Sequence, residues 1–586
     1  MISLAKRYIK KLWKPIEENF IWFLFLYALG AYCNISLAWN GSRIIGFVQL
    51  FLDLYIVVAF GSLLPAKLWN ITKKCLSIFF YTISIIDLFC WFRLSSPISP
   101  TLLTTFLLTN SSEAQEALRS YIDYKAVIKL SPIIILPVLH SIADCSRQIK
   151  SYASRFIKKF SSAGTYATPL ILAAALSLCL KNEIYLFHRI VLGHNDKETF
   201  IANQIEPTVR FYTPTHRFLN AIIERGNSKK TIEQLHQNLG KSTVSCCDFK
   251  SKNIILIIGE SYNRHHSQLY GYEKATTPLQ TKHKEDGSLV VFNNAIALHN
   301  LTNEAFASLL STHCAGDSGE WYNYPLFTTL FRNAGYDVSF FSNQYIQANS
   351  SSYSDFSEDI LVNDPQMSDA QFSRRNNQRY EYDEELIEKH HSLPLDSKGN
   401  LIIYHLMGQH IDFESRYPDR FSRFDEEIYA NENIEHRRIA AHYDNATLYN
   451  DYVLNCIIER FRDEDAIILH IADHGERTCD DDSGYGRSFS YSESDIRQQY
   501  EIPFWIYFTP KYKELHPEVC HSIENAKDLP LCTDNIAHLL LYLGGISTGY
   551  YNEEHNPLSQ CFDSSSPRII NNEFNYDEFS KGYVTE

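Results

Sequence analysis

Two short motifs in the second half of the chain place ionisable side chains directly after apolar runs. Glu260 follows the run Ile254–Ile258. Asp473 and His474 follow the run Ala466–Ile471. Short apolar runs rich in β-branched residues predict strands buried on both faces of a parallel sheet, and open α/β sheets bind ligands at the carboxyl ends of such strands. Glu260, Asp473 and His474 therefore predict a metal site, with the oxygen and nitrogen ligands that zinc takes.

A nucleophile for such a site must come from a hydroxyl-bearing residue. The candidates are Ser261, Thr302, Ser308 and Ser311. Thr302 lies in the segment LHNLTNEAFASLLS, at or near the N-cap of a predicted helix, where the helix dipole and free N–H groups favour a phosphate. Metal coordination would lower the pKa of its hydroxyl. The sequence is equally consistent with Thr302 acting only as a helix cap.

Strands and helices alternate along the chain beyond residue 250. The predicted strands are Ile254–Ile258, Val338–Ser342, Leu401–Leu406, Ala466–Ile471 and Pro503–Phe508. Helical patterns lie between them, as in Pro325–Ala334 and Ile439–Phe461. This alternation predicts an α/β soluble domain with a mostly parallel sheet and helices on both faces.

The first part of the chain is apolar and predicts five membrane helices. The stretches are Phe20–Trp39, Ile44–Leu64, Leu76–Leu94, Tyr124–Ser141 and Thr165–Leu180. Lys and Arg gather in residues 1–19 and in the second-to-third and fourth-to-fifth connections, which predicts a cytoplasmic N-terminus. Five crossings then place the chain from residue 182 onward outside. Asp53 and Asp87 fall within these stretches and predict a hydrogen bond between helices or a position near the membrane interface, with a functional site as the alternative.

The connection 95–123 predicts an amphipathic helical hairpin at the outer membrane surface, where Thr109, Asn110 and Glu113 could hold a lipid head group. An ordinary solvated loop is the alternative. The predicted organisation is a transmembrane domain over residues 1–181, a linker with membrane-surface helices over 182–250, and a catalytic domain over 251–586.

Charge and cysteine content limit the partners and the compartment. The chain carries a net charge of -14, with a balance of +11 in residues 1–181 and -25 in residues 182–586. An acidic soluble part argues against nucleic acid, which needs clustered Lys and Arg. Disulfides are permitted outside the cytoplasm, and Cys520 with Cys532 is the best candidate pair among the 13 cysteines.

Several long motifs together resemble the membrane phosphoethanolamine transferases that modify lipid A and the lipopolysaccharide core, within the alkaline phosphatase/sulfatase superfamily. They read GESYNRHHSQLYGYEKATTP, NAIALHNLTNEAFASLLS, LFRNAGYDVSFFSNQ, IIYHLMGQHIDFESRYP, YDNATLYNDYVL and IADHGE. The five-span anchor and the TNSSEAQEAL hairpin also match, so the resemblance covers nearly the whole chain. It implies that Glu260, Thr302, Asp473 and His474 form a zinc site with Thr302 as the nucleophile, and that His410 lies near the phosphate.

The resemblance also implies the substrates and the location. Thr109 and Glu113 would help to hold the donor, phosphatidylethanolamine. The acceptor would be lipopolysaccharide, at lipid A or a core sugar, or another envelope glycan. The protein would be a multi-pass protein of the bacterial inner membrane, with its catalytic domain in the periplasm and a covalent phospho-threonine intermediate.

The chain departs from the family at two positions that bear on the chemistry. Arg487 stands where many members carry a histidine, so a second zinc ion is in question and Arg487 could instead pair with phosphate. Ser261 follows Glu260 where lipid A-directed members often have Thr, a hint of the core-modifying branch. The alternatives are a phosphoglycerol transferase, another hydrolase of the superfamily, or a non-catalytic membrane-anchored sensor.

Overall fold

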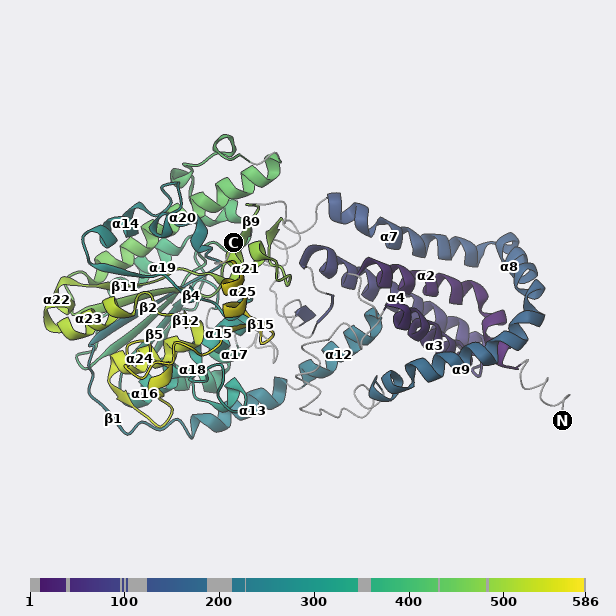
Figure 1. The fold of residues 1–586 in the computed structure, drawn as a ribbon, viewed down its shortest axis with the longest axis horizontal. Helices are drawn as coiled ribbons and strands as arrows, with labels where there is room; N and C mark the ends of the chain where they lie inside the picture. The colour runs from purple at the N-terminus through teal and green to yellow at the C-terminus, as the bar shows by residue number, and fades with distance from the viewer. Residues whose placement is uncertain are drawn as a thin grey trace. The chain divides into compact units, whose positions relative to one another are not determined.

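The computed structural model describes residues 11–37, 43–94, 97–99, 102–103, 124–186, 213–226, 228–345, 360–430, 433–480 and 484–583. The described chain forms two compact units, one of residues up to 226 and one of residues 228–583. Figure 1 shows helices alone in the first unit and a sheet flanked by helices in the second.

Helices in the first unit coincide with all five predicted apolar stretches. The unit contains α2 (Phe20–Ser36), α3 (Arg43–Gly61), α4 (Ala66–Leu94), α7 (Tyr124–Cys145), α8 (Arg147–Lys159), α9 (Ser161–Leu186) and α12 (Pro214–Gly226). In the described chain, three helices are long and apolar enough to cross a membrane, within α4, α7 and α9. A fourth span results if α2 and the bent helix before it count together, whereas α3 gives only a shorter apolar helix. Five crossings therefore stay a prediction.

The two acidic residues of the apolar stretches bind side chains of another helix. Asp87 of α4 is fully buried and accepts two hydrogen bonds from Arg217 of α12, at 2.9 and 2.5 Å. Asp53 of α3 lies 3.2 Å from His216, also of α12. These contacts confirm the predicted pairing between helices, and they tie α12 to the apolar helices.

The second unit is built on a seven-stranded sheet with the order β3-β11-β8-β2-β7-β5-β6. The strands are β2 (Asn253–Gly259), β3 (Leu289–Phe292), β5 (Asp337–Ser342), β6 (Arg374–Arg375), β7 (Asn400–His405), β8 (Ala466–Ala472) and β11 (Phe504–Phe508). Strands β2, β5, β6, β7 and β8 are parallel, while β11 runs antiparallel to both β8 and β3. The five predicted strands and the mostly parallel sheet are confirmed.

Helices cover both faces of this sheet (Figure 1). The second unit contains α13 (Ser228–Leu239), α14 (Pro278–Glu285), α15 (Thr302–Leu310), α16 (Phe327–Ala334), α17 (Ile360–Asn363), α18 (Pro365–Gln371), α19 (Asp383–His390), α20 (Ile434–Phe461), α21 (Glu493–Tyr500), α22 (Pro510–Leu515), α23 (Pro517–Ala526), α24 (Ile536–Gly544) and α25 (Tyr576–Tyr583). Side chains of a strand alternate between its faces. Ile254, Leu256 and Ile258 of β2 accordingly pack in a core with α15, α16 and α24, whereas Ile255 and Ile257 pack in a second core with α19 and α20.

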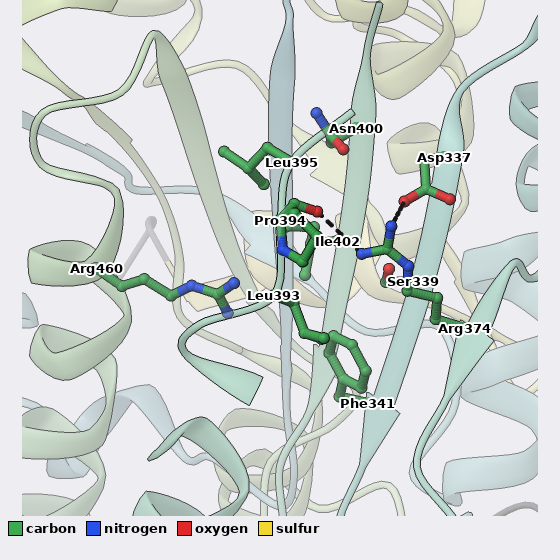
Figure 2. A pocket seen from close by; sticks show the side chains of 10 residues that line it. All are labelled: Asp337, Ser339, Phe341, Arg374, Leu393, Pro394, Leu395, Asn400, Ile402 and Arg460. Atoms are coloured by element: carbon green, nitrogen blue, oxygen red, sulfur yellow. Dashed lines mark hydrogen bonds and ion pairs between the residues drawn. The ribbon is translucent and has the colours of Figure 1, made fainter. Parts of the chain in front are cut away.

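A pocket on the sheet lies apart from the predicted site residues (Figure 2). Strands β5 and β7 line it, and Arg374 bridges two of its walls, with a contact of 3.1 Å to Asp337 and a hydrogen bond of 3.0 Å to the carbonyl of Pro394. None of the predicted catalytic or metal-binding side chains lines this pocket. The candidate site must therefore be sought at the strand ends.

The predicted Cys520–Cys532 disulfide is wrong. All 13 cysteines, each within the described chain, have free thiols. Cys520 lies in α23, which packs on the sheet, and Cys532 ends the two-residue strand β12 (Leu531–Cys532). Closeness in sequence did not bring these two thiols together, because each side chain is buried among its own neighbours: Cys520 packs in the core that contains Ile254, and Cys532 in a separate cluster with Ile296 and Tyr500.

Candidate active site

Parallel pairing of β2 and β8 places the acidic residues of the two motifs next to each other. Gly259 is in register with Ala472, so the residues that follow, Glu260 and Asp473, leave the sheet side by side. Thr302 is the first residue of α15, with Leu301 at the N-cap, one position from the predicted cap. The helix thus presents the Thr302 side chain and its dipole to the strand ends.

Four donor atoms converge at this point. The Thr302 hydroxyl donates to Glu260 Oε2 at 3.1 Å and lies 3.3 Å from His474 Nε2. Asp473 Oδ2 lies 3.2 Å from the same nitrogen. Glu260, Asp473 and His474 are all buried, and their ligand atoms lie within 4.8 Å of one another.

The tautomer of His474 follows from its second nitrogen. His474 Nδ1 lies 2.8 Å from the carbonyl oxygen of Gly475, which can only accept, so Nδ1 carries the proton. Burial, with Arg487 nearby, lowers the pKa of His474 to about 3. The neutral ring therefore keeps a lone pair on Nε2, which lies 3.2 Å from Asp473 Oδ2 and 2.9 Å from the Arg487 guanidinium. A neutral imidazole nitrogen is the form that binds metals.

The Asp473 carboxylate leaves acceptor capacity for a cation. Asp473 Oδ1 accepts from the backbone N–H groups of Ser261 and His474, at 3.1 and 2.7 Å. Asp473 Oδ2 is buried and accepts no hydrogen bond from any residue that the structure describes. Burial and the neighbouring charge of Glu260 raise the pKa of Asp473 well above its usual value. A zinc ion fits this arrangement, because it would bind the Asp473 oxygen and the His474 nitrogen together.

Arg487 is the largest positive group at the site. Its guanidinium donates to Glu260 Oε1 at 3.2 Å, to Glu476 Oε2 at 3.1 Å and to His474 Nε2 at 2.9 Å. Burial alone would raise the pKa of Glu260, but electrostatic interaction with the neighbouring His474, His410 and Arg487 side chains holds it well below the usual range. Arg487 thus lies at the site, beside the predicted metal ligands. Its positive charge offsets the negative charge of the buried Glu260 and Glu476 carboxylates.

His410 lies on the loop that follows β7. The loop turns at Gly408, whose φ is +49° and where a Cβ would lie 3.0 Å from the Glu260 carbonyl oxygen, so any other residue would be strained here. The Asp383 carboxylate holds the loop by accepting from the N–H groups of Met407 and Gly408, each at 2.9 Å. Burial lowers the pKa of His410 to about 4. The imidazole is therefore neutral near pH 7, and it lies close enough to Glu260 for the two side chains to influence each other's pKa.

Sequence reasoning missed Gln344 and Asp383. Gln344 donates to Glu260 Oε2 at 3.1 Å and to the Leu406 carbonyl at 2.8 Å, and so orients the carboxylate that faces Thr302. Gln344 follows the strand β5, so its place at a strand end was the signal that could have found it. Asp383 is the first residue of α19, and nothing in the sequence around it indicates that it contacts the site.

The remaining predicted residues have different outcomes. Thr109 and Glu113 lie outside the described residues. Of the four candidate hydroxyls, all within the described chain, only that of Thr302 contacts both Glu260 and His474. The Ser261 hydroxyl donates to Glu260 Oε1 at 2.6 Å, and that of Ser311 donates to the Trp321 carbonyl at 3.0 Å.

Comparison with known proteins agrees with this geometry. The profile of the sulfatase family matches residues 252–546. "Phosphoethanolamine transferase EptC" of Escherichia coli O18:K1:H7 is 24% identical over 585 residues, which cover 95% of this chain and 94% of that protein. "Kdo(2)-lipid A phosphoethanolamine 7''-transferase" of Escherichia coli K12 is 26% identical over 270 residues, 44% of this chain and 45% of that protein. The membrane protein lipooligosaccharide phosphoethanolamine transferase A (EptA) of Neisseria meningitidis has the same fold, with a TM-score of 0.58 and 18% identity over 92% of this chain and 98% of that one. The resemblance drawn from the motifs is confirmed.

Proposed function

The chain belongs to the sulfatase family, and from that membership and the geometry of the site we propose that it transfers phosphoethanolamine from phosphatidylethanolamine to lipopolysaccharide through a phospho-threonine at Thr302. The observation that carries the proposal is the Thr302 hydroxyl at a helix N-terminus, 3.1 Å from Glu260 and 3.3 Å from His474. The names of the relatives supply the group that is transferred.

The first half-reaction forms a bond between Thr302 Oγ1 and the phosphorus of the donor. The bond from phosphorus to the glycerol oxygen breaks in line, and diacylglycerol leaves with the proton that Thr302 gives up. The N-terminus of α15 favours the anionic phosphate beside Thr302. Arg487 and His410 would hold the non-bridging oxygens, whose charge grows in the transition state.

In the second half-reaction an acceptor oxygen attacks the phosphorus on the side opposite Thr302. The bond from phosphorus to Thr302 Oγ1 breaks, the acceptor proton returns to Thr302, and the product carries phosphoethanolamine. Gln344 and Ser261 keep the Glu260 carboxylate fixed in both steps through their hydrogen bonds of 3.1 and 2.6 Å. Such a double displacement predicts ping-pong kinetics.

Glu260, Thr302, Asp473 and His474 would hold a zinc ion, as their convergent oxygen and nitrogen atoms fit its ligand preference. When bound, zinc would lower the pKa of the Thr302 hydroxyl and offset phosphoryl charge. One ion suffices for this donor set. The guanidinium of Arg487 supplies a fixed positive charge where a histidine of related enzymes would stand.

The apolar helices fit a donor that resides in a membrane. We propose five crossings, an N-terminus in the cytoplasm of a bacterium and a catalytic domain in the periplasm, with the protein in the inner membrane. Thr109 and Glu113 are proposed to hold the ammonium-bearing head group. Diacylglycerol would then return directly to the bilayer.

Turnover of head-group-labelled phosphatidylethanolamine by the detergent-solubilised full chain tests this function. We expect diacylglycerol release and labelled lipopolysaccharide, loss of both after chelation, and recovery on adding Zn²⁺. Thr302→Ala should abolish both products, since the acceptor oxygen has no phospho-threonine to attack. Labelled water-soluble product without labelled lipopolysaccharide would point to a hydrolase. Turnover of phosphatidylglycerol would point to a phosphoglycerol transferase, and lipid binding without turnover to a sensor.

A further inference from the structure

A second cluster of metal-binding side chains lies at the other end of α15. Cys314 and Asp317 follow this helix, and His555 ends the short helix η9 (Glu553–His555). One ligand atom of each of these three residues lies within 4.8 Å of the others. The nine residues of α15 rise by roughly 13 Å, at about 1.5 Å per residue, so the cluster shares no ligand with the site at Thr302.

The local contacts already aim the side chains at one another. His555 Nε2 lies 3.1 Å from Asp317 Oδ1, and the backbone N–H of Cys314 donates to Asp317 Oδ2 at 2.9 Å. Cys314 is 2% exposed, and its thiol lies 3.3 Å from the carbonyl oxygen of Asp534. The Asp534 carboxylate in turn accepts from the N–H of Ala315 at 2.8 Å. Three side chains from two separate segments therefore converge, and Asp534 contacts the same loop through its carbonyl and its carboxylate.

The cluster borders a hollow in the surface of the second unit. Cys314, Cys532, Asp534 and His555 all line it. A thiol, an imidazole and carboxylates around an accessible hollow are the mixed sulfur, nitrogen and oxygen donors of zinc sites, whereas Mg²⁺ and Ca²⁺ prefer oxygen alone. Both cysteines have free thiols.

We propose that Cys314, Asp317 and His555 bind a structural zinc ion, with Asp534 or a water molecule as the fourth ligand. The Cys314 thiol would release its proton to solvent on binding, because the thiolate is the ligand. Tetrahedral zinc, with bonds of about 2.0–2.3 Å, places its ligand atoms roughly 3.3–3.8 Å apart, a spacing that small side-chain movements would reach from the present arrangement. The ion would join the end of α15 to η9 and so fix the helix that presents Thr302.

Cobalt absorption separates this site from the one at Thr302, because only this site contains sulfur. The full chain carrying Glu260→Gln and His474→Gln, freed of metal and titrated with Co²⁺ in detergent, should show thiolate-to-cobalt charge transfer in the near ultraviolet. Adding Cys314→Ser should remove that absorption. Cys456→Ser, which removes a thiol on α20, should leave it intact. Failure of the proposed transferase function would not affect this result.

Melting curves provide a second readout that does not depend on cobalt. Zn²⁺ should raise the melting temperature of the Glu260→Gln/His474→Gln protein by several degrees, and His555→Gln should remove that rise even if Cys314→Ser fails to fold. Absence of the charge-transfer absorption, its persistence in Cys314→Ser, or a Cys314–Cys532 disulfide in the non-reduced protein would each overturn the proposal.

Discussion

The side chains that surround the Thr302 hydroxyl come from three different segments of the chain. Glu260 follows β2, His474 follows β8, and Arg487 comes from the segment after the short strand β10 (Tyr485–Gly486). The Arg487 guanidinium contacts Glu260, Glu476 and His474, so it neutralises buried negative charge and lies beside the proposed phosphate position. Because a guanidinium stays protonated at every physiological pH, Arg487 provides this positive charge throughout that range.

Removing this cation should lower transfer far more than it lowers folding. Arg487→Gln should reduce kcat/KM by about 10²–10³-fold, the usual effect of losing one group that stabilises transition-state charge. Arg487→Lys should restore part of the rate, since it keeps the charge without the planar fork. The transfer rates of both variants can be measured with labelled phosphatidylethanolamine. The exposed Arg462 gives the control, Arg462→Gln, with unchanged kinetics; an equal loss in both variants would exclude a role for Arg487.

Residue types at strand ends were sufficient to predict which side chains meet. Glu260, Asp473 and His474 each follow a strongly apolar strand, and the structure brings their ligand atoms within 4.8 Å of one another. Asp383 could not be predicted in this way, because its carboxylate reaches the His410 loop from the start of α19. The guanidinium contacts of Arg487 could not be predicted either, because Arg487 lies in a loop, and the course of a loop does not follow from the hydrophobic periodicity of the sequence.

At the scale of elements, a buried histidine joins the motif after β2 to α20 and to the short strand β9 (Arg477–Thr478). His266 Nδ1 lies 2.5 Å from Asp444 Oδ1 on α20, and Nε2 lies 2.8 Å from Asp480 Oδ1. Burial alone would lower the pKa of His266, but Asp480 and Asp444 raise it to about 10. The His266 imidazolium therefore forms ion pairs with both Asp444 and Asp480, which join α20 and the segment after β9 to the motif that contains Glu260.

These ion pairs of His266 should make the folded protein less stable as pH rises. The folded pKa of His266, about 10, exceeds its unfolded value of about 6.5, so its contribution is complete below about pH 6.5 and is lost as pH rises toward 10. His266→Gln should cost about 3–5 kcal/mol at pH 6, as expected for breaking a buried ion pair, and much less near pH 10. Melting temperatures of both proteins across this range measure the effect. The exposed His521 is the control, and a pH-independent difference would contradict the assignment.

The main elements of the sheet could be predicted because their apolar runs are long. The strands β3 and β6 were missed, since β6 has two residues and the four of β3 lie between polar turns. The antiparallel direction of β11 was also beyond sequence reasoning, because direction depends on how the chain returns to the sheet rather than on the residues of the strand.

At the scale of the whole molecule, opposite charge balances distinguish the two units. The balance of +11 lies in residues 1–181 and that of -25 in residues 182–586. Cationic residues near membrane helices favour the cytoplasmic side, while the acidic part is compatible with a zwitterionic lipid head group. Composition and hydropathy predicted helices in all five apolar stretches. They could not establish five crossings, because α3 is short and the α2 region is bent.

Two native cysteines can test the proposed topology. Cys145, exposed at the end of α7, should face the cytoplasm, and the exposed Cys561 should face the periplasm. In cells expressing versions that retain only one of them, a membrane-impermeant maleimide should label Cys561 directly and Cys145 only after the inner membrane is permeabilised. Equal labelling of both before permeabilisation would mean an even number of crossings between them.

The most direct test of the account is the mass of the peptide that contains Thr302. The full chain, incubated with phosphatidylethanolamine without acceptor and quenched in acid, should carry one phosphoethanolamine group on Thr302, and adding acceptor should discharge it. Thr302→Ala should carry none and transfer nothing. A phosphoethanolamine group on another residue, or transfer by the Thr302→Ala protein, would contradict the central claim.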